Sequence, residues 1–536
     1  MRALFLFLFL VSCSSLHRQE TEFFTNAFKN SDYEGASAYL EKSAIAKDDK
    51  SKILFHLQKG SILFESAQYK QSVEEFLEAQ RLLDESIERI SRGAISYLAS
   101  DGLKSYLGEY LEQGMINFYL VLNFLNLSEL EVNRQQKRQY LFSARAQIIA
   151  WDLFFEKISQ KNSQAAKFYP TDFLVKILGA FVHEKIESRN ERLIAYDLYK
   201  DAYEALKEFG IILPSFNNSY KDCTRNKIKK KTKCDPIKTD LYKGLESFLE
   251  QKILVLSKDL RKKDFKNWQK KLKGKKILLK KSPQLSILIK SNLIPKKKPY
   301  RFYAPIINYY PNYHQLKSNN YIFGSFATNV LGLQSSGHHH YRGDGRYVLN
   351  DFAELSAAQS TSISFELPSI EDNKPRLFKA LRLESEDGSS QMMTGTLIAP
   401  LGDLFNLNND FRVKKLYPKL ASKLVVKHAA AIITARSVYK KLGGQDGKGK
   451  GSGSLLARTS ALLAYSGSVK LFEYIQRADT RYWSSLPQDI FLLEKESLKA
   501  GEYDIYAEFK DGSSRFIKKV KIDDAKRQFL TLTILD

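Results

Sequence analysis

Cys13 is the residue with the most specific chemistry in this chain, because its thiol stands where a lipid would be attached. Arg2 supplies a positive charge, residues 3–11 form an apolar run, and small serines flank the cysteine. This arrangement is typical of a bacterial secretion signal, with an apolar region of about 7–15 residues, that ends in a lipobox. We therefore expect a signal peptide at residues 1–12 and a diacylglycerol on the Cys13 thiol. A plain secretion signal with an incidental cysteine is the alternative.

The expected lipid anchor also predicts a location. Stable anchoring takes two or more acyl chains, such as palmitate. The apolar run is shorter than the ~20 residues needed to cross a bilayer, and no later segment approaches that length. Ser14, rather than Asp, follows the cysteine, which favours export to the outer membrane in a double-membraned bacterium. We expect residues 13–22 to tether the body to the outer membrane, on its periplasmic face.

Two further cysteines, Cys223 and Cys234, stand in a Lys-rich stretch. An oxidising envelope would allow a disulfide between them, and two free thiols are the alternative. The pair does not make a zinc site by itself, because zinc takes four ligands and no His or third Cys stands nearby.

Other motifs point to ligand or catalytic chemistry only weakly. Residues 444–450 match the first part of a phosphate-binding loop, but Gly451 stands where Ser or Thr would bind magnesium. His338, His339 and His340 are neighbours that cannot all face one ion unless the loop folds around it. Neither a His-Glu-x-x-His helix nor a Gly-x-Ser-x-Gly elbow occurs. We expect no catalytic residue, metal or cofactor, and hence a protein that is not an enzyme.

One basic stretch carries most of the chain's charge. Residues 221–300 contain 26 Lys and Arg against seven Asp and Glu, and so supply +19 of the formal net charge of +24. We interpret residues 211–300 as a Lys-rich insertion that is partly helical. Its charge suits an anionic lipid or wall polymer, since each basic residue near an anionic membrane adds about 1 kcal/mol. The export signal argues against nucleic acid, and a merely solvated insertion is the alternative. The candidate contacts are Lys229, Lys230, Lys231, Arg261, Lys262, Lys263, Lys275, Lys276, Lys296, Lys297 and Lys298.

Residues 23–210 predict an all-α domain of paired helices. Apolar and small residues recur at three- and four-residue spacing. The clearest unit, residues 54–83, has the small, aromatic and alanine positions of a tetratricopeptide repeat, which let two helices pack closely. These positions are Gly60, Tyr69, Ser72, Phe76 and Ala79, with weaker copies at Tyr33, Ala36 and Leu40 and at Gly179, Ala195, Tyr199 and Ala202. Such a stack exposes a concave face that commonly holds peptides, and an ordinary helical bundle is the alternative.

The remaining residues, 301–536, predict an α+β domain. Residues 362–367 alternate as a strand does, and helical spacing follows at 417–442 and 455–478. Alternation returns at 503–509, Asp511-Gly512 makes a hairpin turn, and the pattern continues to residue 534. We therefore predict a multi-domain chain: an all-α, tetratricopeptide-like N-terminal half and an α+β C-terminal half ending in a small antiparallel sheet.

Asp479, Arg481 and Trp483 form the most specific polar cluster in the C-terminal half. We expect a structural role, in which Arg481 bridges a carboxylate and Trp483 caps the core between the helices and the last sheet. Ligand binding is the alternative.

Two groups of residues carry a resemblance to a known family. The first comprises residues 106–112 (Tyr-Leu-Gly-Glu-Tyr-Leu-Glu), 117–119 and 122–125; the second comprises 478–487 (Ala-Asp-Thr-Arg-Tyr-Trp-Ser-Ser-Leu-Pro) and 500–503. Together they make the chain similar to a family of uncharacterised bacterial lipoproteins with a tetratricopeptide-like N-terminal half. The resemblance implies an envelope protein, often encoded near a lipoprotein that activates peptidoglycan synthases, and it implies no residue-level role.

These observations predict a non-enzymatic envelope lipoprotein that acts as a scaffold for protein partners, linked to assembly of the cell wall or outer membrane. A binder of anionic lipid or wall polymer through residues 221–300 is the second hypothesis. A wall-active enzyme is the third.

Overall fold

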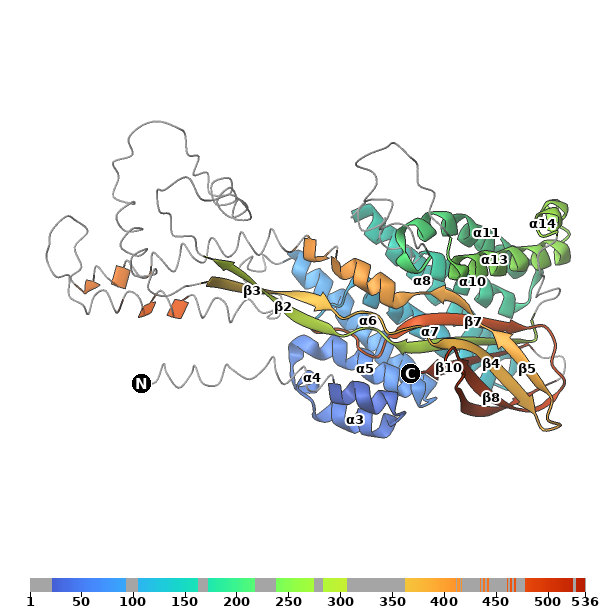
Figure 1. Cartoon of the computed structure of the whole chain (residues 1–536), viewed down its shortest axis with the longest axis horizontal. Coiled ribbons are helices and arrows are strands. Elements are labelled where there is room, and N and C mark those ends of the chain that lie inside the picture. Colours follow the sequence, from blue (N-terminus) through green and yellow to red (C-terminus); the bar gives the residue numbers. More distant parts are fainter. Residues whose placement is uncertain are drawn as a thin grey trace, which may run out of the picture.

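The computed structural model describes residues 22–92, 105–161, 172–216, 238–273, 283–305, 362–410, 412–414, 416, 478–523 and 527–535, with isolated residues between 434 and 468. Figure 1 shows a layer of helices lying against β-sheets. The predicted architecture is confirmed: the N-terminal half is helical, and the C-terminal half combines helices with small sheets. Within the described residues, no helix is both long and apolar enough to cross a bilayer.

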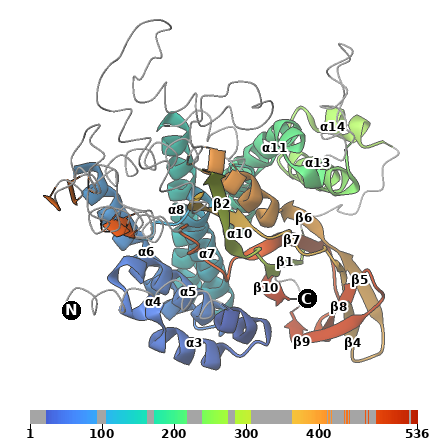
Figure 2. The same ribbon diagram turned by 60° about the vertical axis from the view of Figure 1, so that its left-hand side comes forward.

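Helices that follow one another in the chain pack side by side. The sequence of contacts runs α5 to α6, α7, α8, α10, α11, α13 and α14, each helix touching the next (Figure 2). This one-dimensional order is what a stack of helix pairs produces. The helices are α3 (Tyr33–Lys42), α4 (Ala44–Lys47), α5 (Lys52–Glu65), α6 (Tyr69–Arg92), α7 (Tyr110–Leu130), α8 (Arg134–Lys161), α10 (Asp172–Ile186), α11 (Arg189–Ile212), α13 (Asp240–Asp259) and α14 (Phe265–Lys271).

The pair α5–α6 has the close packing that its residue types predict. A side chain at Gly60 would place its Cβ 2.9 Å from the Phe76 ring, so only glycine lets the two helices approach this far. The Ser72 hydroxyl donates to the Gly60 carbonyl at 2.8 Å, and Ala79 is buried beside them. The close packing of this helix pair thus depends on side-chain size, because the small Gly60 of α5 leaves room for the Phe76 ring of α6.

The described strands form three sheets. The main sheet has the order β10-β1-β7-β6, the second has the order β5-β4-β8-β9, and the third is the pair β2-β3. The strands are β1 (Leu285–Leu293), β2 (Lys297–Pro305), β3 (Ser362–Ile370), β4 (Phe378–Ser385), β5 (Ser390–Thr394), β6 (Thr396–Ala399), β7 (Pro487–Lys495), β8 (Gly501–Phe509), β9 (Ser514–Ile522) and β10 (Gln528–Ile534).

The main sheet lies against the helical layer through α7, α10 and α13. Every residue of β1 is buried, as its run of Leu and Ile requires of a strand covered on both faces. Helix α7 is buried almost all round because it lies between its neighbouring helices and β10. The two halves of the chain therefore share one continuous core.

Two details differ from the sequence-based expectation. Strand β1 falls within the predicted Lys-rich insertion, yet it is a central strand of the main sheet, hydrogen-bonded on both sides. The hairpin at Asp511-Gly512 does join β8 to β9 in an antiparallel sheet, with Gly512 at a φ of 87°. Strand β10, however, leaves that sheet and pairs parallel with β1. Strand β9 carries several Lys and Arg residues, and such charge blunts further pairing at an edge.

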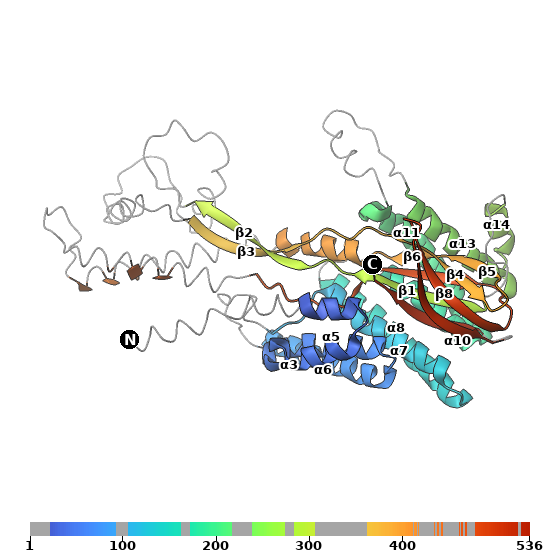
Figure 3. The same cartoon turned by 60° about the horizontal axis from the view of Figure 1, so that its bottom comes forward.

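Strands β2 and β3 form a ribbon that projects from the body, as Figures 1 and 3 both show. The pairing runs in antiparallel register from Lys297 opposite Ile370 to Pro305 opposite Ser362. The end of the ribbon that begins at Lys297 is the one attached to the body, so this residue lies at its root.

Candidate functional site

Residues 478–486 form an extended segment that lies on the tetratricopeptide-like unit before entering β7. Its Trp483 is fully buried and packs beside the rings of Phe76 and Tyr119, with centroids 5.6 and 5.3 Å away. The indole Nε1 donates to the hydroxyls of Ser61 at 2.9 Å and Ser485 at 2.8 Å. Trp483 is thus held among α5, α6 and α7, while the segment that carries it leads into the main sheet.

Helix α5 presents a second polar side chain to the same segment. The Gln58 amide donates to the Ser484 hydroxyl at 2.9 Å and its oxygen accepts from the Ser485 hydroxyl at 2.7 Å. Gln58 is buried, so both ends of its amide are used inside the protein. This face of α5 is occupied by the chain's own segment, residues 478–486.

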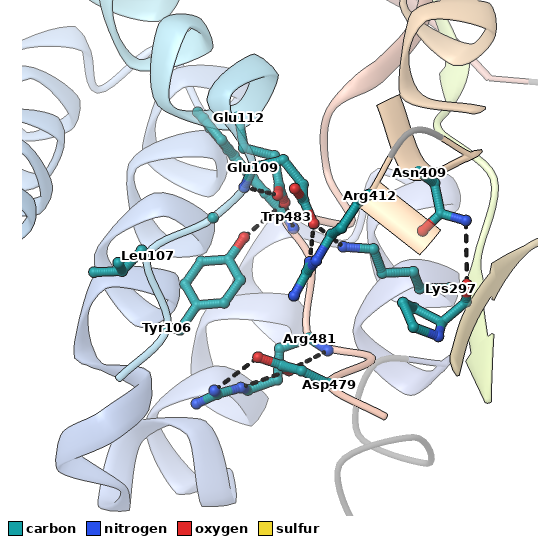
Figure 4. Close-up of polar contacts among 12 residues, drawn as sticks. Tyr106, Leu107, Glu109, Glu112, Lys297, Asn409, Arg412, Asp479, Arg481 and Trp483 are labelled. Carbon is teal, nitrogen blue, oxygen red and sulfur yellow. Dashed lines mark hydrogen bonds and ion pairs between the residues drawn. The ribbon is translucent and has the colours of Figure 1, made fainter. Parts of the chain in front are cut away.

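Glu112 joins this segment to the start of α7. Its carboxylate accepts from the Tyr106 hydroxyl, the Trp483 backbone N–H and the Glu109 backbone N–H, each at 2.6 Å (Figure 4). The last contact completes a capping box at the N-terminus of the helix. Burial raises the pKa of Glu112 above its ordinary value, because removal from water disfavours the charged form.

Glu109 is held by two cations from distant parts of the chain. Lys297, at the root of the β2–β3 ribbon, lies 3.1 Å from its Oε1, and Arg412 contacts the same oxygen. Burial opposes ionisation of Glu109, but the two cations outweigh it and lower its pKa. Two glutamates one helical turn apart therefore have pKa values shifted in opposite directions, and the difference lies in their partners.

Asp479 and Arg481 form a two-pronged ion pair, with Nε and Nη2 each 2.9 Å from a carboxylate oxygen. The guanidinium also donates to the Lys50 carbonyl at 3.3 Å and lies over the Tyr106 ring, 5.7 Å from its centroid. Arg481 does bridge a carboxylate, that of its near neighbour Asp479.

A pocket of about 210 Å³ lies where these groups meet. It is the strongest candidate site, because it brings together residues of the segments 106–112 and 478–487, which are far apart in the sequence (Figure 4). Its charged side chains are Glu109, Glu112, Asp479, Lys297, Arg412 and Arg481. The contacts above show that these side chains are engaged with each other, with the Tyr106 hydroxyl or with backbone groups. These noncovalent contacts hold the start of α7, the ribbon and the segment 478–486 together.

Other buried ion pairs tie the helices to the main sheet. Lys290 of β1 pairs with Glu65 of α5, and Thr533 of β10 donates to the same carboxylate at 2.7 Å. Lys252 of α13 lies 3.0 Å from Glu494 of β7 and also pairs with a glutamate of α10. The Lys290–Glu65 and Lys252–Glu494 pairs each join the helical layer to the main sheet.

The predicted anionic-partner residues lie in very different places. Lys297 is buried in its ion pair, with 2% of its side chain exposed. Lys296 pairs with Glu22 and Lys298 with Glu371. These three lysines therefore lie at the root of the ribbon. They do not form one open surface together with Arg261, Lys262 and Lys263.

Arg261, Lys262 and Lys263 stand at the turn between α13 and α14 and face solvent, with Lys262 half-buried against the Tyr196 ring. The remaining predicted residues lie outside the described part of the chain: Cys13, Cys223, Cys234, Lys229, Lys230, Lys231, Lys275 and Lys276. The same holds for residues 338–340 and 444–450.

Sequence reasoning singled out only part of this site. It identified Asp479, Arg481 and Trp483, but gave no role to Glu109, Glu112 or the polar side chains of α5. The spacing Glu109-x-x-Glu112 before an apolar run is a capping signal. Polar Gln58 and Ser61 among the apolar residues of α5 were a second available signal.

No group of three or more His, Cys, Asp or Glu side chains in the described residues is arranged to hold a metal ion. Comparison of the chain with protein-family models, with curated proteins and with solved structures gives no match.

Proposed function

We propose that this chain is a non-enzymatic envelope lipoprotein that acts as a rigid scaffold for protein partners in assembly of the cell wall or outer membrane. The observation that carries the proposal is the buried polar node of Glu109, Glu112, Lys297, Arg481 and Trp483. Its hydrogen bonds join the helical half, the ribbon and the C-terminal half. A body cross-linked in this way suits holding partners at fixed positions.

The occupied face of α5 bears on where partners would dock. Because the chain's own residues 478–486 lie on it, a partner would use outer surfaces of the helical layer. Buried groups committed to internal contacts favour a structural reading over a catalytic one, since a general acid or base needs a free site for the proton it transfers.

Site-specific photo-crosslinking in cells tests the scaffold proposal. A crosslinking residue at Leu77 of α6 or Ile194 of α11, both exposed, should capture one defined set of envelope proteins. The same crosslinking amino acid placed at Met392 of β5, which is also exposed, gives a comparison position on the second sheet instead of the helical layer. The proposal fails if no position yields a protein adduct above the background of cells without the probe.

The anchor has its own test. Cys13→Ser should move the protein from the membrane fraction to the soluble periplasmic fraction, because diacylglycerol can no longer be attached. Retention of the variant in washed membranes would contradict the lipobox interpretation.

A second candidate function, binding of an anionic lipid or wall polymer, is supported by the surface of residues 261–273. Within it, Arg261, Lys263, Lys266 and Lys270 are exposed. Its one acidic residue, Asp264, accepts a hydrogen bond from the Trp268 indole at 3.3 Å and contacts the Tyr196 hydroxyl. The positive charge of this surface therefore faces solvent, and Trp268 and Tyr196 lie beneath it.

Vesicle sedimentation distinguishes this second function. Binding to vesicles containing phosphatidylglycerol should fall steeply with salt and should be lost on Arg261, Lys263, Lys266 and Lys270→Gln. Lys296→Gln with Lys298→Gln is the matched control, because these cations already have carboxylate partners. Unchanged binding by the first variant would overturn the assignment.

A further inference from the structure

Helix α8 has two apolar faces, and within the described part of the chain only one of them packs against neighbouring helices. The inner face packs against α7 and α10 (Figure 2) through buried residues spaced three and four apart: Leu141, Ala144, Ile148, Trp151, Phe155 and Ile158. Phe142, Ala146, Ile149 and Leu153 repeat with the same spacing on the opposite side of the helix. We call these four residues the outer stripe.

The outer stripe is exposed where it is most apolar. Ile149 is 53% exposed and Leu153 is 52% exposed. Phe142 is half-buried beneath the guanidinium groups of Arg138 and Arg145, which lie 5.2 and 4.9 Å from its ring centroid. An apolar row in the spacing of a coiled-coil seam is suited to another helix.

Charge beside the outer stripe indicates which helix that is. Along one flank the helix carries Arg138 and Arg145 in its N-terminal part and Asp152 and Glu156 in its C-terminal part. Arg145 is already fixed by Glu191 at 2.7 Å, and Glu156 accepts a hydrogen bond from Gln160, so the charged ends keep their places. The flank is positive at one end and negative at the other.

We infer that α8 pairs antiparallel with α8 of a second copy of this chain, about a twofold axis near residues 147 and 148. The axis brings Phe142 next to Leu153 of the second copy and Ala146 next to Ile149 of the second copy. In the same register, Arg138 faces Glu156 of the second copy. A parallel twofold pair would instead set this flank beside the opposite flank of the second copy, so that Arg138 and Glu156 would not meet.

The apolar and charged residues agree on one register, which is what makes the pairing specific. Self-complementary surfaces of this kind produce twofold dimers, the commonest oligomers. A stripe of four side chains per copy falls in the small class of interfaces, so we expect association in the micromolar range. The inference does not depend on the proposed scaffold partners or on the lipid anchor.

Sedimentation velocity of the purified mature chain with Cys13→Ser tests the inference. We expect a monomer–dimer equilibrium that is weakened at least tenfold by Ile149→Asp or Leu153→Asp. Leu130→Asp, at an exposed apolar residue of α7, is the matched control and should not change it. Circular dichroism establishes that each variant keeps its helix content.

Charge exchange tests the antiparallel register. Arg138→Glu alone and Glu156→Arg alone should each weaken the dimer, and the double variant should restore it, because the exchanged charges face each other again across the axis. A protein that stays monomeric at the highest concentration overturns the inference. So does a dimer that is insensitive to the stripe variants, or one that the double variant fails to restore.

Discussion

Two runs of three basic residues, 261–263 and 296–298, differ in how far the protein neutralises their charge. Both belong to the same Lys-rich region and are equivalent in composition. The first lies on an exposed turn, whereas Lys297 in the second is buried against Glu109 and both of its neighbours have carboxylate partners. A basic run therefore stays exposed to solvent in one place and forms internal ion pairs in the other. What decides between them is the carboxylate that the fold brings alongside.

We expect the largest loss of stability at the buried polar node, to which Lys297 of the run 296–298 belongs. Trp483→Ala should destabilise the protein by about 3–5 kcal/mol, because it removes a fully buried indole from among three helices. Urea denaturation followed by circular dichroism measures the change. Phe516→Ala, at a ring that is half exposed, is the control and should lower stability far less. Equal losses would mean that Trp483 is not central to the node.

A direct contrast within the buried run comes next. Lys297→Met should cost about 2–4 kcal/mol, because it breaks a buried ion pair and removes one of the two cations that contact Glu109. Lys298→Met should cost at most about 1 kcal/mol, because that pair is exposed to solvent. The comparison between the two runs would lose its basis if both substitutions had the same effect on urea denaturation.

The pH dependence of the node sharpens the same point. The pKa of Glu109 is lowered, so its stabilising contribution is present above the ordinary value of 4.5 and is lost as pH falls below it. The pKa of Glu112 is raised, so its contribution is present below 4.5 and is lost as pH rises through the shifted value. The stability difference between wild type and Glu109→Gln should therefore shrink on acidification, and that for Glu112→Gln should grow.

Urea denaturation at a series of pH values measures both differences. Slopes of the same sign for the two variants would contradict the assignment of their partners.

The smallest effect on stability belongs to the exposed run. Changing Arg261, Lys263, Lys266 and Lys270 together to Gln should alter the free energy of unfolding by no more than about 0.5 kcal/mol per residue, because these side chains face solvent. A large loss by urea denaturation would show that this run, too, is part of the internal framework.

Local patterns in the sequence determined much of the architecture. Helical spacing predicted the N-terminal half, and Gly60 with Phe76 predicted the close helix pair, because a missing side chain and a ring are complementary wherever they meet. The turn at Asp511-Gly512 was predictable for a similar reason, since few residues other than glycine adopt a φ of 87°. Each of these depends on contacts between residues that are close in the chain.

Long-range pairing was decided only by the tertiary structure. Nothing in the run of Leu285 to Leu293 states that it will lie between β7 and β10, and nothing in Lys297 states that Glu109, 188 positions away, will neutralise it. Likewise, Gln58 and Ser61 predict a polar face on α5, but not that residues 478–486 will fill it. Burial and pairing of polar groups depend on which distant surface arrives to cover them, and that is a property of the whole fold.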